Sequence, residues 1–522
     1  MLRRALKVGA LGAGIGATVG GTYLSLRYND VHNLGVCRFA RTVITVGGIV
    51  KDYKTSFSHM KELDEGYAEA RHGFHKRSAE RLLKLCCVNG GCYVKVGQHI
   101  AALEYLLPDE YINTLKVLHA NAPQSSIASV RQVIREELHQ EIEQLFEEFD
   151  EVPIGCASLA QVHRARLRTG EHKDGKGHLV AVKVQHNDVY RNSFTDMAVM
   201  ELLGRLIDRL FPEFSLLWLV EETKMNLPKE LDFAHEADNC EEARRRLSHL
   251  PWLRVPGVWR EWTTRRVLVM EFVDGGFVND RSYLKKHGIS PYKVVQRLGQ
   301  LYSEMIFEQG FVHCDPHPGN ILVDPHGGLV LLDHGLYSRL SNEFRDQYTR
   351  IWLAIIGRDV RGIEDVAAEM HVPVHLTKIL ASILTGRRWR AIAEGSMQRS
   401  GGSAESLEIK QFAARHVDLL NAVLRAVPRE MLLLFKTNDL LRGIEASLGT
   451  RHAAKSFVTM AQSCVRGVYG RQLRDPNLGL GTRIMLYVQQ WLSLMSISIY
   501  QWLRYVRFTL ADTLDAYSHS SK

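Results

Sequence analysis

The sequence is poor in cysteine, and the spacing of its cysteines fits neither a structural metal site nor a disulfide framework. Only 8 of the 522 residues are cysteine. Cys86, Cys87 and Cys92 lie close together, but no C-x-x-C pair occurs. Structural zinc sites and small secreted domains both depend on regularly spaced cysteines. We therefore expect reduced, buried thiols.

Signatures of nucleic-acid recognition are also missing. The net charge is +8 and the pI about 9.0, but the basic residues are spread along the chain. Zinc-finger spacing and aromatic RNA-binding motifs are absent. We therefore expect no nucleic-acid partner, whereas an anionic lipid surface remains open. Apolar content of 45% is that of a globular chain, and the length suits several domains or one large bilobal unit with extensions.

Acidic residues are missing from the start of the chain, where the first is Asp30. Basic, acid-poor N-termini are typical of mitochondrial targeting segments. The uncharged, glycine-rich stretch 8–26 is also long enough to span a bilayer, which takes about 20 residues per crossing. Residues 1–30 therefore form either a membrane anchor, which we favour, or a cleaved presequence.

Residues 70–150 predict a helical extension. A helical pattern over 74–107 is interrupted at Asn89-Gly90-Gly91 and ends before Pro108. A second amphipathic pattern covers 127–149 and predicts a helix capped by Ser125 or Ser126. Within the first pattern, Lys95 and Gln98 share one helix face.

Residues 151–275 begin with a change to strand patterns. Small residues precede an alternating strand that ends at Leu167, and a second strand, 179–184, carries Lys183. Small residues let backbone N–H groups approach phosphate oxygens, and a lysine on the next strand can reach the same phosphates. The candidate phosphate-binding loop consists of Ile154, Gly155, Ala157, Ser158 and Val162.

A long helical pattern over 216–246 follows, and it contains Glu236. We expect Glu236 to pair with Lys183, although a solvated acidic helix face is the plainer interpretation. The apolar strand 267–273 then runs into Asp274-Gly-Gly. A glycine hinge after a buried strand would line an adenine slot, which makes Glu271 and Val273 candidate contacts.

The segment 311–336 carries the strongest chemical signal. Two apolar runs, 321–323 and 329–332, are separated by a glycine-containing turn and predict a β-hairpin. Asp315 and Asn320 precede the hairpin, and Asp333 follows it. One carboxylate that accepts a hydroxyl proton, with further oxygen ligands for Mg²⁺, is what phosphoryl transfer requires. The order Asp-x4-Asn…Asp-x-Gly is that of the protein-kinase catalytic and metal-binding loops.

The chain lacks the peptide-docking segment that usually follows such loops. The next helix is predicted to begin at Ser341, shortly after Gly335, and no A-P-E tripeptide occurs. We therefore expect a small or lipid-like acceptor. The remainder of 276–475 is predicted to be helical, with a loop at 395–403.

A linker at 476–481 leads to an uncharged stretch over 484–503. A single membrane span, an in-plane interfacial helix and a helix docked on the core all remain open for the segment 482–510. Its glutamine and serine content favours the last two.

Together these motifs resemble the UbiB-type atypical kinases, the aarF-domain-containing kinase family, over roughly 70–450. Lys95-Val-Gly-Gln98 looks like the family's K-x-G-Q motif, the loop 155–158 is similar to its Ala-rich loop, and Glu230 with Asp232 matches its E-x-D motif. The resemblance implies an α+β, bilobal protein-kinase-like fold that binds ATP and Mg²⁺. Its lobes would be 151–275 and 276–475, with an N-terminal helical extension and extra C-lobe helices.

The resemblance also implies that the K-x-G-Q helices occlude peptide substrates, with Lys95, Gln98, Glu230 and Asp232 in that role. Animal members of the family are mitochondrial and linked to coenzyme Q, lipid handling and inner-membrane organisation. The resemblance therefore implies a mitochondrial, inner-membrane-associated protein with membrane lipid or inner-membrane proteins as partners.

Four positions depart from the usual kinase pattern. Cys156 interrupts the alanine loop, and His334 replaces the phenylalanine of Asp-Phe-Gly. Cys314 stands where many protein kinases have arginine, and His317 where Ser/Thr kinases carry a phosphate-neutralising lysine. Because histidine is only partly charged near pH 7, we expect slow transfer, or ATP hydrolysis without another acceptor.

Three functions are compatible with these patterns. The first, which we favour, is a membrane-associated kinase or ATPase that uses Asp315 as base. The second is a catalysis-independent kinase-fold scaffold that organises inner-membrane proteins. In the third, His313, Asp315, His317 and His334 would hold a transition metal for hydrolysis.

Overall fold

The computed structural model divides the chain into two compact units. Unit 1 comprises 1–168 and 182–227, and unit 2 comprises 169–181 and 228–522. The structure describes residues 35–57, 64, 66–101, 107–120, 124–168, 177–210, 217–386, 389–393, 417–450, 455–473, 477–495, 497 and 499. The predicted segment 8–26 and the predicted loop 395–403 lie outside these residues.

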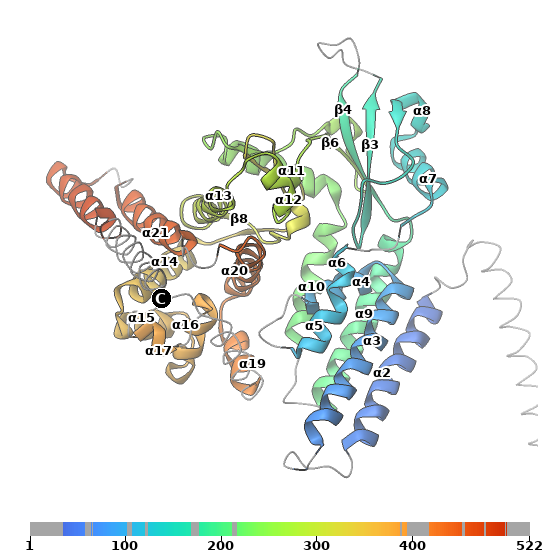
Figure 1. Cartoon of the computed structure of the whole chain (residues 1–522), viewed down its shortest axis with the longest axis horizontal. Helices are drawn as coiled ribbons and strands as arrows, with labels where there is room; N and C mark the ends of the chain where they lie inside the picture. The colour runs from blue at the N-terminus through green and yellow to red at the C-terminus, as the bar shows by residue number, and fades with distance from the viewer. Residues whose placement is uncertain are drawn as a thin grey trace, which may run out of the picture. The chain divides into compact units, whose positions relative to one another are not determined.

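Unit 1 is built around a set of packed helices (Figure 1). These are α2 (Gly35–Phe57), α3 (Tyr67–Asn89), α4 (Cys92–Ala101), α5 (Asp109–Leu115), α6 (Val117–Ala120), α7 (Ile127–Leu138), α8 (Ile142–Leu145) and α9 (Val189–Leu210). The predicted break between α3 and α4 is confirmed, because Gly90 ends α3 at a φ of 65°, a conformation that glycine adopts at little cost. The apolar sides of α3, α4, α5 and α6 meet in a core that includes Leu85, Val94, Leu115 and Leu118.

The sheet of unit 1 carries the candidate phosphate-binding loop. Its strands are β1 (Phe146–Phe149), β2 (Gly155–Cys156), β3 (Ala160–Leu167) and the second part of β4 (Leu179–Gln185), and β3 lies between β1 and β4. The short strand β2 pairs antiparallel with β3, so that Gly155 faces Val162. The two strands predicted around Lys183 are thereby confirmed.

Two predicted helices are wrong in extent. The pattern over 127–149 ends as the strand β1, which pairs antiparallel with β3; the glutamates at 147 and 148 face outward there. Ser126 does cap α7, since its side chain accepts a hydrogen bond from the Ser129 N–H. The pattern over 216–246 is two helices, α10 (Leu217–Glu230) and α11 (Phe233–Arg246), separated at Asp232. Asp232 accepts from the Ala234 N–H and so starts a new helix.

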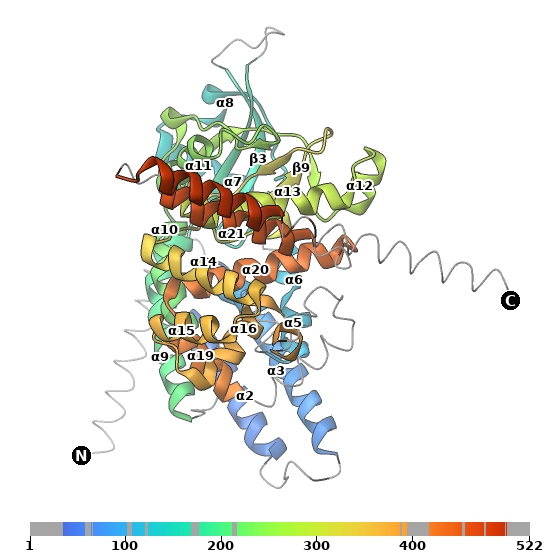
Figure 2. The same ribbon diagram turned by 90° about the vertical axis from the view of Figure 1, so that its left-hand side faces the viewer.

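Unit 2 is mostly helical and contains short strands, of which β9 lies near α12 and α13 (Figure 2). Its strands are β5 (Leu253–Arg254), β6 (Val267–Glu271), β7 (Gly276–Phe277), β8 (Phe311–His313), β9 (Ile321–Val323), β10 (Leu329–Leu331) and β11 (Tyr337–Arg339). The order β5-β10-β9-β7 forms one sheet, and β8 pairs with β11. Besides α11, its helices are α12 (Arg281–Lys286), α13 (Pro291–Ser303), α14 (Asn342–Gly357), α15 (Val360–Glu369), α16 (Thr377–Thr385), α17 (Trp389–Ala393), α19 (Val417–Ala426), α20 (Arg429–Ser447) and α21 (Lys455–Leu473).

The predicted hairpin is the centre of unit 2. Strands β9 and β10 pair antiparallel with Leu329 opposite Val323, and all six of their residues are buried. Four short strands suffice for this sheet because the helix α13 packs against β10. The helix α13 continues as a π-helical turn (Glu304–Gln309) that ends at Gly310, directly before β8. The predicted helix start at Ser341 is also confirmed, since Ser341 caps α14.

All eight cysteines belong to the described residues, and all are free thiols. Five of them are buried, as expected, but Cys87 is exposed, and Cys37 and Cys156 are partly exposed. The expectation of uniformly buried thiols is therefore wrong at these three positions.

The C-terminal apolar stretch begins as a helix over 480–495. Large apolar side chains stand out from this helix, with Leu480 77% exposed and Trp491 60% exposed. Among the residues that the structure describes, no helix is both long and apolar enough to cross a bilayer.

Candidate functional site

The loop after β8 places Asp315 and Asn320 next to each other. The Asn320 side-chain nitrogen donates to the Asp315 main-chain carbonyl oxygen at 3.1 Å. Because a carbonyl oxygen can only accept, the Nδ2 side of the amide faces the loop and its Oδ1 points the other way. The same loop is closed by the His317 N–H, which donates to the Asp315 carbonyl at 2.7 Å. The amide oxygen of Asn320 is thus directed away from the backbone of the loop.

Asp333 is tied to this loop through His313. The Nε2 atom of His313 lies 2.8 Å from the Asp333 carbonyl oxygen, and its Nδ1 lies 2.9 Å from the Tyr302 hydroxyl. The carbonyl must accept, so Nε2 carries the hydrogen and Nδ1 can accept from Tyr302. Burial lowers the pKa of His313 and raises that of Tyr302 well above its ordinary value. His313 is therefore a neutral bridge between two functional loops.

The turn after β10 is held by α11. Glu236 is fully buried, and its Oε1 accepts from the His334 N–H at 3.3 Å. Asn239 donates to the His334 carbonyl at 3.0 Å, and Asp333 accepts from the Gly335 N–H at 3.0 Å. The replacement of phenylalanine by histidine at 334 is accommodated by hydrogen bonds, since His334 Nε2 lies 3.2 Å from the Leu331 carbonyl.

The donor set of these loops fits a hard cation. Asn320 and Asp333 offer an amide oxygen and a carboxylate, which are ligands that Mg²⁺ prefers. A transition-metal centre does not fit: both ring nitrogens of His313 and both of His334 have partners within the protein. Within the described part of the chain, no group of three or more His, Cys, Asp or Glu is placed to hold a metal ion. The hypothesis of a histidine-based hydrolase is therefore wrong.

Asp315 also has a partner that the sequence did not suggest. The Lys436 Nζ lies 3.0 Å from the Asp315 Oδ1, and the two side chains are 20% and 22% exposed. Lys436 belongs to α20, far along the chain, and no local motif surrounds it. Only the tertiary fold reveals this pair.

The hinge residues occupy the end of β6. The Glu271 N–H donates to the Gly257 carbonyl at 2.8 Å, and the Glu271 carboxylate pairs with Arg254. Val273 is buried in a small apolar cluster with Leu322 and Val330. The following glycines are required sterically, since a Cβ at Gly276 would lie 2.2 Å from the ring of Tyr283. The hinge is thus a tight turn beside the hairpin.

In unit 1, the candidate phosphate-binding loop is a compact turn. The Ile154 N–H donates to the Val162 carbonyl and the Ala157 N–H to the Ala160 carbonyl, each at 2.8 Å. His186 lies 3.2 Å from the Ala157 carbonyl oxygen. Ser158 is buried, whereas Gly155 is exposed with no neighbouring atom within 4 Å of a Cβ built there. The exposed backbone at 155 is therefore accessible to a ligand.

Lys183 is almost completely buried on β4. It belongs to unit 1, whereas Glu236 belongs to unit 2, and their pairing stays a prediction. Burial of a lysine is costly without an anionic partner, which is the physical reason for expecting one.

The residues of the K-x-G-Q and E-x-D motifs also fall in different units. On α4, Gln98 donates to the Leu118 carbonyl at 2.9 Å, and Lys95 occupies the same helix face. Glu230 is buried at the end of α10, where its Cγ lies 3.9 Å from the position of a Cβ built at Gly335. Glu230 thus flanks the Asp-His-Gly turn within unit 2, and the occluding role of these motifs stays a prediction.

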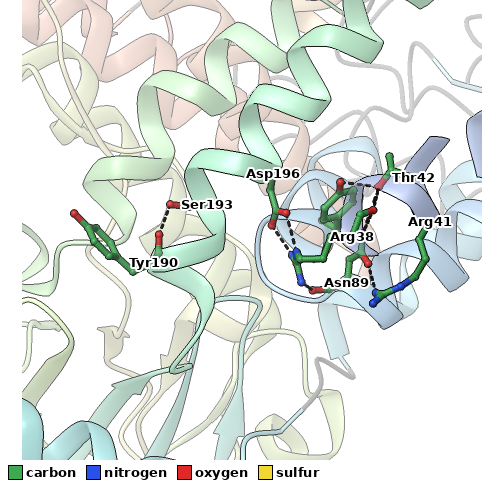
Figure 3. Close-up of polar contacts among 8 residues, drawn as sticks. Arg38, Arg41, Thr42, Asn89, Tyr190, Ser193 and Asp196 are labelled. Carbon is green, nitrogen blue, oxygen red and sulfur yellow. Dashed lines mark hydrogen bonds and ion pairs between the residues drawn. The ribbon is translucent and has the colours of Figure 1, made fainter. Parts of the chain in front are cut away.

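A buried ion pair in unit 1 was also missed by sequence reasoning. Figure 3 shows Arg38 of α2 pointing toward Asp196 of α9, with Asn89 and Thr42 around it. The Arg38 Nε donates to the Asp196 Oδ1 at 2.8 Å, and a second guanidinium nitrogen donates to the Asn89 carbonyl. Both members of the pair are at most 4% exposed. Positions 158 residues apart carry no local signal of such a contact.

Comparison with known proteins identifies the family of this chain. The model of the ABC1 atypical kinase-like domain matches residues 117–367. The AarF domain-containing protein kinase 1 of Gallus gallus is 45% identical over 513 residues, which cover 97% of this chain and 96% of that protein. This chain belongs to the AarF domain-containing kinase family. The Drosophila melanogaster AarF domain-containing kinase 1 is 41% identical over 508 residues, 96% of each chain.

Membership of the AarF domain-containing kinase family confirms the resemblance and the predicted α+β, kinase-like fold class. It makes the chain a kinase-like protein at the level of its family. Among solved structures, the chain aligns with the Mycobacterium tuberculosis protein of "The complex structure of Rv3197-erythromycin" at 19% identity and a TM-score of 0.43, over 74% of this chain and 99% of that one.

Proposed function

We propose that the protein is an atypical kinase or ATPase that binds Mg-ATP and transfers its γ-phosphoryl group to a small or lipid-like acceptor, or to water. The observation that carries this proposal is the hydrogen-bonded network of unit 2, in which His313 links the loop of Asp315 and Asn320 to the turn of Asp333. The network holds the backbone of these residues, whose side chains would provide one proton acceptor and two oxygen ligands.

Each residue has a defined task in this proposal. Asp315 accepts the proton of the attacking hydroxyl, and Asn320 and Asp333 hold Mg²⁺, which when bound neutralises charge on the phosphate oxygens. Lys183 binds the α- and β-phosphates and Glu236 orients it. The Glu271 carbonyl and the Val273 N–H receive adenine, and the backbone of 154–158 with Val162 covers the phosphates.

The nature of the acceptor follows from the short connection after the Asp-His-Gly turn. Strand β11 begins two residues after Gly335 and α14 begins at Asn342. A peptide-docking segment has no room in this connection. A small molecule or a lipid headgroup is therefore the proposed acceptor.

The proposed location is the mitochondrial inner membrane. Support comes from the basic, acid-poor N-terminus and from the exposed apolar side chains of the helix over 480–495. An amphipathic helix of this kind binds at a lipid interface. Roles in lipid or coenzyme Q homeostasis and in maintaining cristae are part of this proposal, with membrane lipid and inner-membrane proteins as partners.

The test combines nucleotide binding with turnover in the full-length protein. ATP should raise the melting temperature of the wild type more with Mg²⁺ than without it, and Asp333→Asn should lose that metal-dependent increment. Asp315→Asn should keep the thermal shift but lose at least about 100-fold in ADP formation, the contribution typical of a general base. ADP formation at the wild-type rate by Asp315→Asn would reject Asp315 as the base.

A catalysis-independent scaffold is the second candidate. It is favoured by Cys314 and His317, which replace the usual arginine and lysine and so weaken stabilisation of the transferred phosphoryl group. Full rescue of a null phenotype by an Asp315→Asn, Asp333→Asn double variant would support the scaffold. Failed rescue at normal protein level would support the enzyme.

A further inference from the structure

The base loop of unit 2 lacks the arginine and lysine that protein kinases usually carry around the base. Cys314 is completely buried, and burial raises the pKa of its thiol to about 12, so that it stays neutral. The Nδ1 atom of His317 accepts a hydrogen bond from the Gly319 N–H at 3.1 Å. The kinase positions that usually carry arginine and lysine are thus occupied by a buried thiol and by an imidazole whose Nδ1 serves as a hydrogen-bond acceptor.

A cation reaches this loop from α20 instead. Lys436 places its Nζ 3.0 Å from the Asp315 Oδ1. Its charge also acts on the neighbouring residues: burial and, to a smaller extent, Lys436 lower the pKa of His313, and Lys436 offsets part of the rise that burial causes in the pKa of Cys314. Thr437, the next residue of α20, likewise offsets part of the rise in the Cys314 pKa. The helix thus lies directly against the His-Cys-Asp sequence.

The position of Lys436 on this helix is fixed by buried contacts. Leu434, Phe435 and Thr437 around it are at most 1% exposed. Asn438 donates to the Tyr348 hydroxyl at 3.2 Å, and Arg442 donates to the Leu384 carbonyl at 3.1 Å. Because α20 is anchored on both α14 and α16, the lysine is presented by a rigid element rather than by a loop.

We propose that Lys436 is the positioning residue for the base of the phosphoryl-transfer reaction and supplies the cation that Cys314 and His317 do not. This inference rests on the proposed function. The ion pair between Lys436 and Asp315 fixes the rotation of the Asp315 carboxylate. In the reaction, the acceptor oxygen forms a bond to the γ-phosphorus as the bond to the β,γ-bridging oxygen breaks. The electron pair of that bond leaves with ADP, and the acceptor's proton moves to Asp315.

The charge of Lys436 does not change in this step. A carboxylate held in one orientation is ready for the acceptor, whereas a misplacement of about 1 Å costs on the order of 100-fold in rate. The ammonium group also offsets negative charge that gathers around the transferred group. Lys436 therefore affects turnover more than the binding of ATP.

The experiment measures ADP formation from Mg-ATP by the full-length protein, with water as acceptor. Lys436→Met, which keeps the length of the side chain without its charge, should lower kcat by about 100-fold. The KM for ATP and the melting temperature should change little. Lys436→Arg should keep most of the activity. Lys378→Met removes an exposed lysine from α16 and is the matched control, expected to equal the wild type.

Moving the positive charge to another residue distinguishes a positioning role from a purely structural one. If Lys436 were only structural, a cation at another position would not restore kcat. The double variant Lys436→Met, His317→Lys returns a positive charge to the loop at its usual kinase position, and we expect it to recover at least about tenfold in kcat over Lys436→Met. If Lys436→Met fails to fold, the neutral, hydrogen-bonding Lys436→Gln is tested by the same criteria. No recovery, with a melting temperature well below that of the wild type, would overturn the inference in favour of a structural lysine.

The outcomes separate this inference from the proposed function. Turnover of Lys436→Met within twofold of the wild type, beside an inactive Asp315→Asn, would overturn the role of Lys436 and leave the proposed function intact. A wild type without any Mg-ATP turnover would overturn both.

Discussion

His313 donates the hydrogen of its Nε2 atom to the main-chain carbonyl oxygen of Asp333, across 2.8 Å and 20 residues of sequence. Its other ring nitrogen faces the hydroxyl of Tyr302. Burial holds the pKa of His313 below its ordinary value of 6.5. His75, His163 and His186 have lowered pKa values for the same reason.

These histidines predict a loss of stability in mild acid. Below about pH 6.5 these histidines bind protons in the unfolded chain but not in the folded chain. The free energy of unfolding therefore falls as the pH falls. Each histidine contributes up to about 1.4 kcal/mol per pH unit. His313→Gln should therefore make the dependence on pH less steep between about pH 6.5 and 5, as measured by urea denaturation. His375→Gln, at an exposed position, is the control, and equal slopes in both variants would contradict the prediction.

The pair of Arg38 and Asp196 predicts a strongly asymmetric response to mutation. Arg38→Met leaves a buried carboxylate without its partner and should cost about 3–5 kcal/mol of unfolding free energy. The double variant Arg38→Met, Asp196→Leu removes both charges and should recover most of this loss. Arg205→Met, which breaks an exposed ion pair with Glu201 on α9, should leave the denaturation midpoint unchanged. A double variant as unstable as Arg38→Met would show that the cost arises from packing instead of from charge.

Gly97 predicts a steric requirement inside the K-x-G-Q motif. A Cβ at this position would lie 2.5 Å from the Leu118 Cδ1 and 3.1 Å from the Cys86 Sγ, both in a buried core. Gly97→Ala should therefore cost about 1–3 kcal/mol in chemical denaturation. Gly48→Ala on α2 is the matched control: no atom lies within 4 Å, so the variant should gain up to about 1 kcal/mol from helix propensity. Equal stability of the two variants would argue against close packing as the reason for Gly97.

The helix over 480–495 predicts binding to lipid vesicles. Ile484 and Trp491 are 56% and 60% exposed. Burying a large apolar side chain contributes about 1.5–3 kcal/mol, so Ile484→Glu with Trp491→Glu should weaken partitioning at least about 100-fold. The assay is sedimentation of the full-length protein with vesicles that contain anionic phospholipid. Val374→Glu changes another exposed apolar residue and should have no effect. Equal binding of the wild type and the double variant would exclude this helix as the contact.

Local patterns predicted the elements that lie close in sequence. The hairpin of β9 and β10 is bounded by a turn with strong local preferences, and Ser126 and Ser341 are capping residues with short-range partners. The fold class followed from the family resemblance that the motifs carry. The spacing of Asp315, Asn320 and Asp333 reflects loops that adjoin one hairpin, and so it was visible without coordinates.

Where tertiary contacts decide the outcome, local patterns were insufficient. The segment after α8 has a helical pattern, yet it pairs with β3 as a strand, because sheet pairing outweighs local propensity. Asp232 was predicted to lie inside one long helix, whereas its side chain caps α11. The partners of Asp315 and Arg38 come from distant helices, and single residues without a surrounding motif give no signal in a sequence.

The placement of Lys436 on α20 has a consequence for the order in which this protein is made. Residues 117–367, which match the family's domain, include Asp315, Asn320 and Asp333 but not α20. During synthesis from the N-terminus, the base therefore leaves the ribosome well before its counter-ion. A nascent chain arrested between the two would carry an incomplete catalytic loop, so that competence for phosphoryl transfer would arise only once most of the polypeptide had been translated.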